Sequence, residues 1–70
     1  MDSYRLAVVG GGNMGAALVG GLLGAEWAPA DIAVVEVLAA RRERLSEMFP
    51  GVTITDTIPP CRGALIAVKP

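Results

Sequence analysis

The chain has 70 residues, of which 53% are hydrophobic and 19% are charged, and its formal net charge is −1. This length allows one small domain, because a chain of about 60 residues buries only about 60% of the surface that it exposes when unfolded. The net charge is close to zero and the sequence has no stripe of basic residues, which argues against nucleic acid and anionic membrane as partners. The chain has one cysteine and no histidine, which argues against a disulfide or a clustered metal site.

A glycine-rich motif follows the first apolar segment. Arg5–Val9 is predicted to be a buried strand, and Asn13–Ala25 is predicted to be a helix. Between them, Gly10-Gly11-Gly12-Asn13-Met14-Gly15 matches Gly-x-Gly-x-x-Gly in the strand–turn–helix context of a dinucleotide fingerprint. The first glycine allows the tight turn, the second lets the backbone approach a pyrophosphate, and the third lets the helix pack closely. The helix N-terminus offers N–H groups to the phosphates, so the motif predicts a nicotinamide or flavin dinucleotide site.

The predicted first helix has an apolar face and contains two internal glycines. Met14, Leu18, Leu22 and Ala25 recur at helical spacing and are expected to face inward. Gly20 and Gly21 are expected to let the helix lie close to the sheet. Trp27-Ala28-Pro29 ends this helix in a loop.

The rest of the chain alternates between strands and helices. Strands are predicted at Ile32–Val35, Val52–Ile54 and Ala64–Val68, and a second helix at Leu38–Phe49, which Pro50-Gly51 stops. The inward residues of this helix are expected to be Leu38, Leu45, Met48 and Phe49, whereas Arg41, Arg42, Arg44 and Glu47 are expected to be largely solvated. Such apolar strands are typical of a parallel sheet that is buried on both faces.

The connection Thr55–Gly63 contains Pro59-Pro60, which forbid a regular helix. A sheet order of 3-2-1-4 lets a loop or one helical turn make this crossing. The predicted fold class is therefore α/β: a partial Rossmann-like parallel sheet of order 3-2-1-4 with two helices, truncated after the fourth strand. Cys61 is expected to be a small, partly buried hydrophobe.

Glu36 gives a second dinucleotide signal, because an acidic residue about 20 positions after the fingerprint accepts hydrogen bonds from the adenosine ribose. A carboxylate at this point repels a 2′-phosphate, which favours NADH. Arg41 and Arg42 instead offer bidentate donors to a 2′-phosphate, which favours NADPH. The sequence leaves the choice between NADH and NADPH open.

Two polar residues have both a structural and a cofactor-binding interpretation. Lys69 is either a solvated strand end or, with Ala67, Val68 and Pro70, part of the lining of the nicotinamide side. Asn13 either satisfies the helix backbone or faces the diphosphate.

Three segments together resemble the N-terminal region of pyrroline-5-carboxylate reductase. They are Leu6-Ala7-Val8-Val9-Gly10-Gly11-Gly12-Asn13-Met14-Gly15, Ile32-Ala33-Val34-Val35-Glu36 and Ala67-Val68-Lys69-Pro70. The resemblance implies NAD(P)H-dependent reduction of the small molecule 1-pyrroline-5-carboxylate to L-proline, the last step of proline biosynthesis. It places Gly10 to Gly15 on the pyrophosphate, Glu36 at the adenosine ribose, and Ala67 to Pro70 at the nicotinamide half.

The chain also departs from this family. Thr55-Asp56-Thr57 lacks the Asn that usually follows the third strand, and Pro59-Pro60 stand where a helix is typical. By resemblance, residues 1–70 correspond to the N-terminal part of a dinucleotide-binding domain. By the same resemblance, we expect the helical substrate and dimerisation domain of the homo-oligomeric family members to be absent from these residues. We therefore expect that this chain alone is inactive, and its catalytic residues are unassigned.

Two alternatives stay open. One is the N-terminal half of another NAD(P)-dependent reductase or dehydrogenase, such as the hydroxyisobutyrate or deazaflavin-dependent NADP reductase groups. The other is a non-catalytic dinucleotide-binding module. The N-terminus lacks the features of a signal peptide, and the first apolar run is far shorter than the roughly 20 residues of a membrane helix. The expected location is therefore the cytoplasm.

Overall fold

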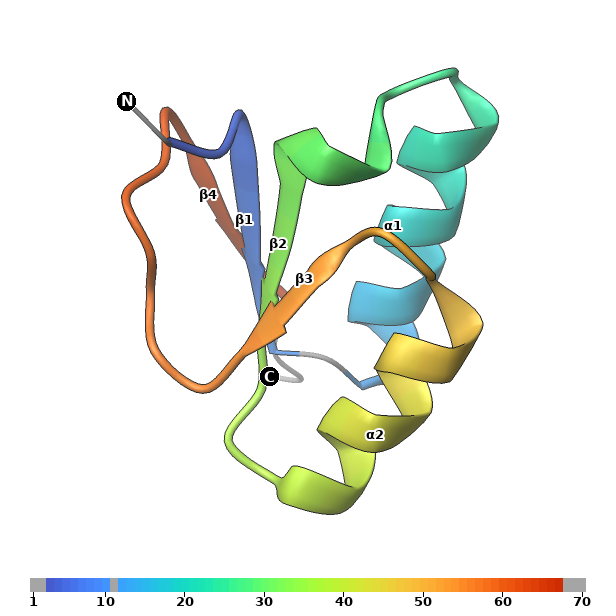
Figure 1. Cartoon of the computed structure of the whole chain (residues 1–70), viewed down its shortest axis with the longest axis vertical. Helices are drawn as coiled ribbons and strands as arrows, with labels where there is room; N and C mark the ends of the chain where they lie inside the picture. Colours follow the sequence, from blue (N-terminus) through green and yellow to red (C-terminus); the bar gives the residue numbers. More distant parts are fainter. Residues whose placement is uncertain (1–2, 11, 68–70) are drawn as a thin grey trace.

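A four-stranded parallel sheet of order β3-β2-β1-β4 forms the centre of the molecule (Figure 1). The computed structural model describes residues 3–10 and 12–67. The elements are β1 Leu6–Val9, α1 Asn13–Gly24, the 3₁₀ helix η1 Pro29–Asp31, β2 Ile32–Val35, α2 Ala39–Met48, β3 Thr53–Thr55 and β4 Ala64–Ile66. The predicted α/β class, the partial Rossmann-like sheet, its strand order and its two α-helices are confirmed.

The element boundaries differ from the prediction by one or two residues. Arg5 lies in a bend rather than in β1, and its guanidinium lies 4.0 Å from the centre of the Trp27 ring. β3 is shifted by one residue toward the C-terminus, and its last residue, Thr55, accepts a hydrogen bond from the Glu36 N–H. The predicted end of the fourth strand, Val68, lies outside the described residues.

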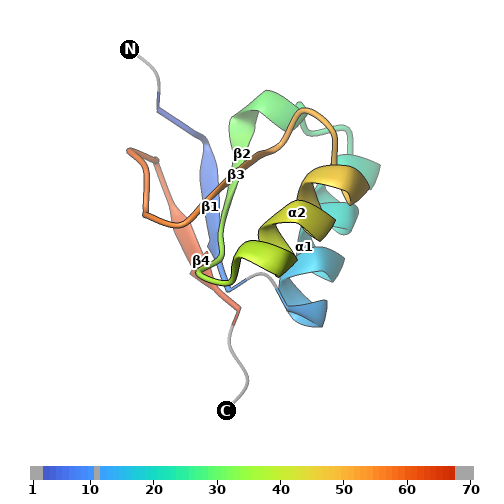
Figure 2. The ribbon, with the colours of Figure 1, turned by 60° about the horizontal axis from the view of Figure 1, so that its bottom comes forward.

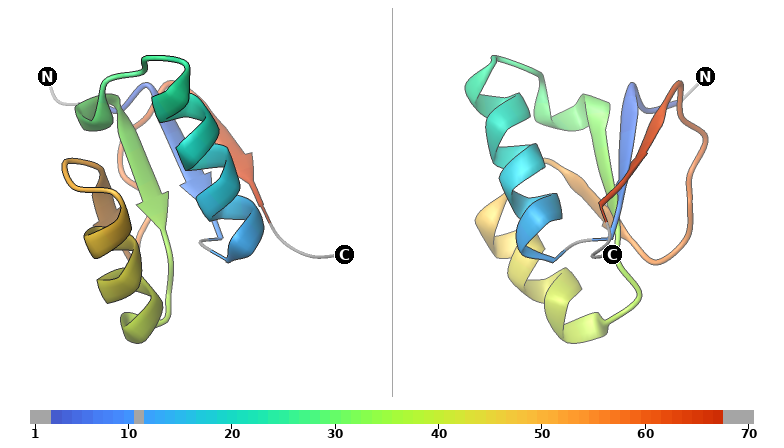
Figure 3. Two further views of the ribbon diagram at one scale, coloured as in Figure 1. Left: turned by 90° about the vertical axis from the view of Figure 1, so that its right-hand side faces the viewer. Right: turned by 180° about the vertical axis from the view of Figure 1, so that it is seen from behind.

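Both α-helices cover the same face of the sheet, and the segment that joins β3 to β4 crosses the opposite face (Figures 1 and 3). The chain moves from β1 to β2 to β3 in one direction across the sheet. Crossovers of the same hand then place α1 and α2 on one side, where they lie side by side (Figure 2). The opposite side of the sheet carries Ala7, Ala33 and Thr53, which lie in register on β1, β2 and β3.

The core lies between the helices and the central strands. Val8, Val19, Ile32 and Val34 are fully buried, and Leu45 is nearly so. Burying a side chain of this kind contributes about 1.5–3 kcal/mol.

Burial on both faces holds for β2 but not for β4. All four residues of β2 are buried, whereas all three residues of β4 are exposed. Ile66 is 72% exposed and Leu65 is 45% exposed. The expectation of uniformly buried strands was therefore wrong for β4, because this strand lies at the edge of the sheet and pairs with β1 alone.

The buried face of α1 is rotated by about one residue from the predicted face. Gly15 and Val19 are its buried residues, while Leu18 and Leu22 are partly buried. Met14 and Ala25, which were expected to face inward, are exposed. The contact between Gly15 and the end of β1 sets this rotation, and spacing alone does not contain that information.

Two further inward predictions fail on α2. Leu45 is buried and Phe49 packs against the core as expected, but Leu38 is 51% exposed and Met48 is 52% exposed. The helix is short and begins at Ala39, so a narrow stripe of side chains reaches the sheet and residues at both ends lie outside it.

The two internal glycines of α1 do not serve close packing. Gly20 and Gly21 are exposed, and a Cβ atom placed on either would have no neighbouring atom within 4 Å. The predicted role of these small residues is therefore wrong, and Gly21 lines a hollow with Leu65 of β4 instead of making a close contact with the sheet.

The connection between β3 and β4 is an irregular loop, as Pro59-Pro60 predict. Tyr4 anchors it: the Tyr4 N–H donates to the Pro60 carbonyl (3.0 Å), and the Arg62 N–H donates to the Tyr4 carbonyl (2.8 Å). The Tyr4 hydroxyl lies 2.9 Å from the Thr53 Oγ1. Cys61 is partly buried beside Tyr4, as expected. The loop thus holds β4 next to β1 without a helix.

Candidate dinucleotide site

The carboxyl ends of the parallel strands bring most of the predicted site residues to one edge of the sheet. The glycine turn follows β1, Glu36 follows β2, and Ala67 follows β4. Ala67 is buried, and its N–H donates to the Val9 carbonyl at 2.7 Å, so it lies beside the glycine turn as predicted. Gly11, Val68, Lys69 and Pro70 lie outside the described residues.

Gly10 makes the sharp exit from β1. Its φ is 94°, a left-handed conformation that favours glycine. Its N–H donates to the Val35 carbonyl at 2.9 Å, which ties the turn to the end of β2. The predicted role of the first glycine in the tight turn is confirmed.

Gly15 packs directly against the backbone of Gly10. A Cβ atom on Gly15 would overlap the Gly10 carbonyl and would also approach a methyl group of Val8. No side chain fits between α1 and the end of β1 at this point. The expected close packing of helix and strand is therefore present.

Gly12 has a different surrounding, because it opens toward free space. It is the N-cap of α1 with extended backbone, and its carbonyl accepts the Ala16 N–H at 2.9 Å. A Cβ atom on Gly12 would meet only the Arg41 Nη1, at 3.9 Å. The first N–H groups of a helix have no partner within the helix, so an anion can reach this end of α1 without meeting a side chain at Gly12.

Asn13 and Met14 are exposed in the first turn of α1. Asn13 lies at the rim of a hollow between the two helices, and no side chain caps the first turn of α1. This placement favours the interpretation in which Asn13 faces a ligand over the one in which it satisfies the helix backbone.

Glu36 is buried at the end of β2, with 6% of its surface exposed. Its Oε2 accepts the Leu38 N–H at 3.0 Å, and its Oε1 lies 4.0 Å from the Arg41 Nη1. The carboxylate therefore supports the start of α2 and holds an arginine at the same time. It lies where the fingerprint requires an acidic residue, but it is engaged by its own loop.

Arg42 closes the turn between β2 and α2. Its Nη1 donates to the carbonyl oxygens of Glu36 and Val37, both at 2.9 Å. From the sequence, Arg41 and Arg42 together are candidate donors to a ligand phosphate. In the structure, the Arg42 guanidinium instead binds the backbone carbonyl oxygens of its own turn. Arg41 remains, with 57% of its side chain exposed.

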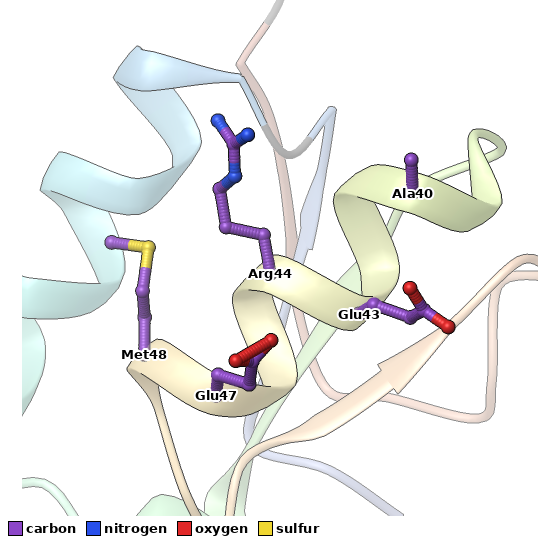
Figure 4. A pocket seen from close by; sticks show the side chains of 5 residues that line it. All are labelled: Ala40, Glu43, Arg44, Glu47 and Met48. Atoms are coloured by element: carbon purple, nitrogen blue, oxygen red, sulfur yellow. The ribbon is translucent and has the colours of Figure 1, made fainter.

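A hollow of about 100 Å³ lies between the start of α1 and the middle of α2. It is lined by Gly12, Asn13, Ala16, Arg41, Arg44, Leu45 and Met48. Arg44 extends toward the start of α1 and Met48 extends toward α1, whereas Glu43 lies on the other side of α2 (Figure 4). Arg44 is exposed, as the sequence predicts, but its place beside the hollow was not predicted. Its spacing of three residues from Arg41, which places both on one side of a helix, was the available signal.

No protein-family model, curated protein or solved structure matches the chain. Within the described residues, no helix is long and apolar enough to cross a membrane. The same residues contain no group of three or more His, Cys, Asp or Glu side chains that could hold a metal ion. The fold and the geometry of the glycine turn are therefore the structural observations from which a function can be proposed.

Proposed function

We propose that this chain binds NADPH or NADH through the turn between β1 and α1. The observation that carries the proposal is the combination at Gly10, Gly12 and Gly15. The first has positive φ, the second opens to free space, and the third packs on backbone. These are the three separate requirements of the Gly-x-Gly-x-x-Gly fingerprint, and an accidental pattern has no reason to meet all of them.

The proposed placement of the cofactor follows from the topology. Its pyrophosphate lies at the start of α1, its adenosine ribose lies near Glu36 after β2, and its nicotinamide half extends toward Ala67 after β4. This is the switch point between β1 and β4, where open α/β sheets bind ligands.

The reaction that we propose for the protein containing this sequence is the reduction of 1-pyrroline-5-carboxylate to L-proline. The resemblance of three segments to pyrroline-5-carboxylate reductase supports it. The bound nicotinamide would supply the hydride to the imine, and the turn would hold the cofactor in place, which is a large part of such catalysis. Another NAD(P)-dependent reductase and a non-catalytic binding module are the alternatives.

Binding is tested by titrating the chain with NADPH and NADH and measuring heat by calorimetry. We expect saturable binding that Gly12→Val abolishes, because a side chain there takes the space of the pyrophosphate. Gly20→Ala is the matched control: Gly20 is also a glycine of the α1 region, but it lies in open space and its substitution leaves affinity unchanged.

Unchanged affinity in a folded Gly12→Val variant would refute the assigned site. The reaction is tested separately on the protein that contains this sequence: the oxidation of NADPH is followed with 1-pyrroline-5-carboxylate, and the reduction of NADP is followed with a hydroxy acid. Turnover of the hydroxy acid alone would replace the reductase proposal with the dehydrogenase alternative.

A further inference from the structure

We infer that the hollow between α1 and α2 receives the 2′-phosphate of NADPH, and that the site therefore prefers NADPH to NADH. This inference rests on the proposed function and names the cofactor that the sequence left open. Two arginines on consecutive turns of α2, Arg41 and Arg44, line the hollow together with Gly12 and Asn13 at the start of α1.

Arg41 stands between the glycine turn and the acidic residue after β2. Its Nη1 is 4.0 Å from the Glu36 Oε1, and it is the nearest atom, at 3.9 Å, to a Cβ placed on Gly12. The adenosine ribose of a bound dinucleotide lies beside the residue that follows β2. The Arg41 guanidinium is thus positioned where a phosphate on the ribose 2′ oxygen would fall.

Arg44 completes the pair from the next turn of α2. It extends toward the start of α1, and it also lines a neighbouring hollow together with Glu43 and Glu47 of the same helix (Figure 4). Ala16 and Leu45 give the hollow an apolar wall, while the side chains of both arginines are exposed to solvent. Two guanidinium groups offer the planar donors that bind phosphate oxygens in pairs.

A carboxylate at the position of Glu36 repels a 2′-phosphate, but the carboxylate of Glu36 already interacts with groups of its own chain. It is buried, accepts the Leu38 N–H, and is paired with Arg41. Arg41 and Arg44 are the charged side chains among those that line the hollow, and Glu36 is not one of the lining residues. Glu36 acts as a positioning residue that holds Arg41 at the rim.

The experiment measures dissociation constants of NADPH and NADH for the chain and for Arg41→Ala and Arg44→Ala. A hydrogen bond to a charged group is worth about 1.5–3 kcal/mol, which corresponds to about tenfold or more in affinity. We expect NADPH to bind at least about tenfold more tightly than NADH, and each variant to weaken NADPH by about tenfold while NADH changes less than twofold. Arg62→Ala is the control, since Arg62 is an exposed arginine of the loop between β3 and β4.

Competition with 2′,5′-ADP and 5′-ADP identifies the phosphate concerned. If the arginine variants weaken NADPH and NADH equally, the pair binds the pyrophosphate and the inference is overturned. Equal affinity of the unaltered chain for both cofactors also overturns it, with the proposed function intact. If neither cofactor binds to the folded chain, the proposed function itself fails. Circular dichroism of each variant verifies folding, and Arg41→Lys should restore part of the NADPH affinity.

Discussion

The two turns that lead from a strand into a helix are built in opposite ways. The turn from β1 to α1 depends on the absence of side chains at Gly10 and Gly15, whose backbones touch. The turn from β2 to α2 depends on the side chains of Glu36 and Arg42, which bind the backbone of the turn. The first turn leaves the end of its helix open to a ligand, whereas the second occupies that space with its own carboxylate. An open turn and a closed turn thus differ in whether side chains of the turn itself fill the space at the start of the helix.

The largest effect is expected from a side chain at the contact in the first turn. Gly15→Val places atoms where the Gly10 carbonyl lies, and we expect the free energy of unfolding to fall by about 3 kcal/mol or more. Urea denaturation followed by circular dichroism measures it. A variant as stable as the original chain would show that the turn is not held by backbone packing.

Removing the carboxylate from the turn between β2 and α2 should lower the free energy of unfolding by a smaller amount than Gly15→Val does. Glu36→Ala takes the acceptor from the Leu38 N–H and the partner from Arg41, and we expect a loss of about 2 kcal/mol. Glu36→Gln keeps an acceptor oxygen and should lose clearly less. Equal losses in both variants would mean that the charge, rather than the hydrogen bond, closes this turn.

Arg42→Ala is expected to destabilise the fold by about 1–1.5 kcal/mol, because two carbonyl oxygens lose a donor at a partly exposed site. Arg44→Ala removes the same kind of side chain from the same helix and should change stability by less than about 0.5 kcal/mol. Thermal unfolding of the two variants side by side makes the comparison. The proposed division of roles on α2 requires that the first variant melt at the lower temperature.

The smallest expected change is an increase, not a decrease, in the free energy of unfolding. Gly20→Ala adds a methyl group where no atom lies within 4 Å, so the gain in helix propensity of about 0.5–1 kcal/mol is not offset by a clash. Gly15→Ala serves as its contrast and should destabilise. A destabilised Gly20→Ala chain would mean that this face of α1 packs against something else.

The strands and their order follow from sequence because local signals agree there. The apolar runs before Gly10 and Glu36 are short and bounded by turn residues, and Pro59-Pro60 remove the alternative of a third helix. The roles of Gly10 and Gly15 in the first turn were likewise predictable, since each follows from the geometry that a close strand–helix turn requires.

The side-chain roles on the helices were less predictable. Apolar spacing placed Met14 and Met48 inward, but a tertiary contact at Gly15 and the short length of α2 decided which residues are covered. Three arginines within four positions of α2 look equivalent in sequence. Only the direction in which each side chain leaves the helix separates Arg42, which binds backbone, from Arg41 and Arg44, which face the hollow.

The pairing of β1 with β4 joins opposite ends of the described chain, since Ala7 stands beside Ala64. The pairing of Leu6 with Ile32 closes a much shorter stretch. Because the entropy lost on closing a loop grows with its length and non-local sheets form slowly, we expect β1, β2 and β3 to assemble first and β4 to join last. The rate-limiting event in folding is then the return of the chain to its first strand, and amide hydrogens of β4 should exchange sooner than those of β2.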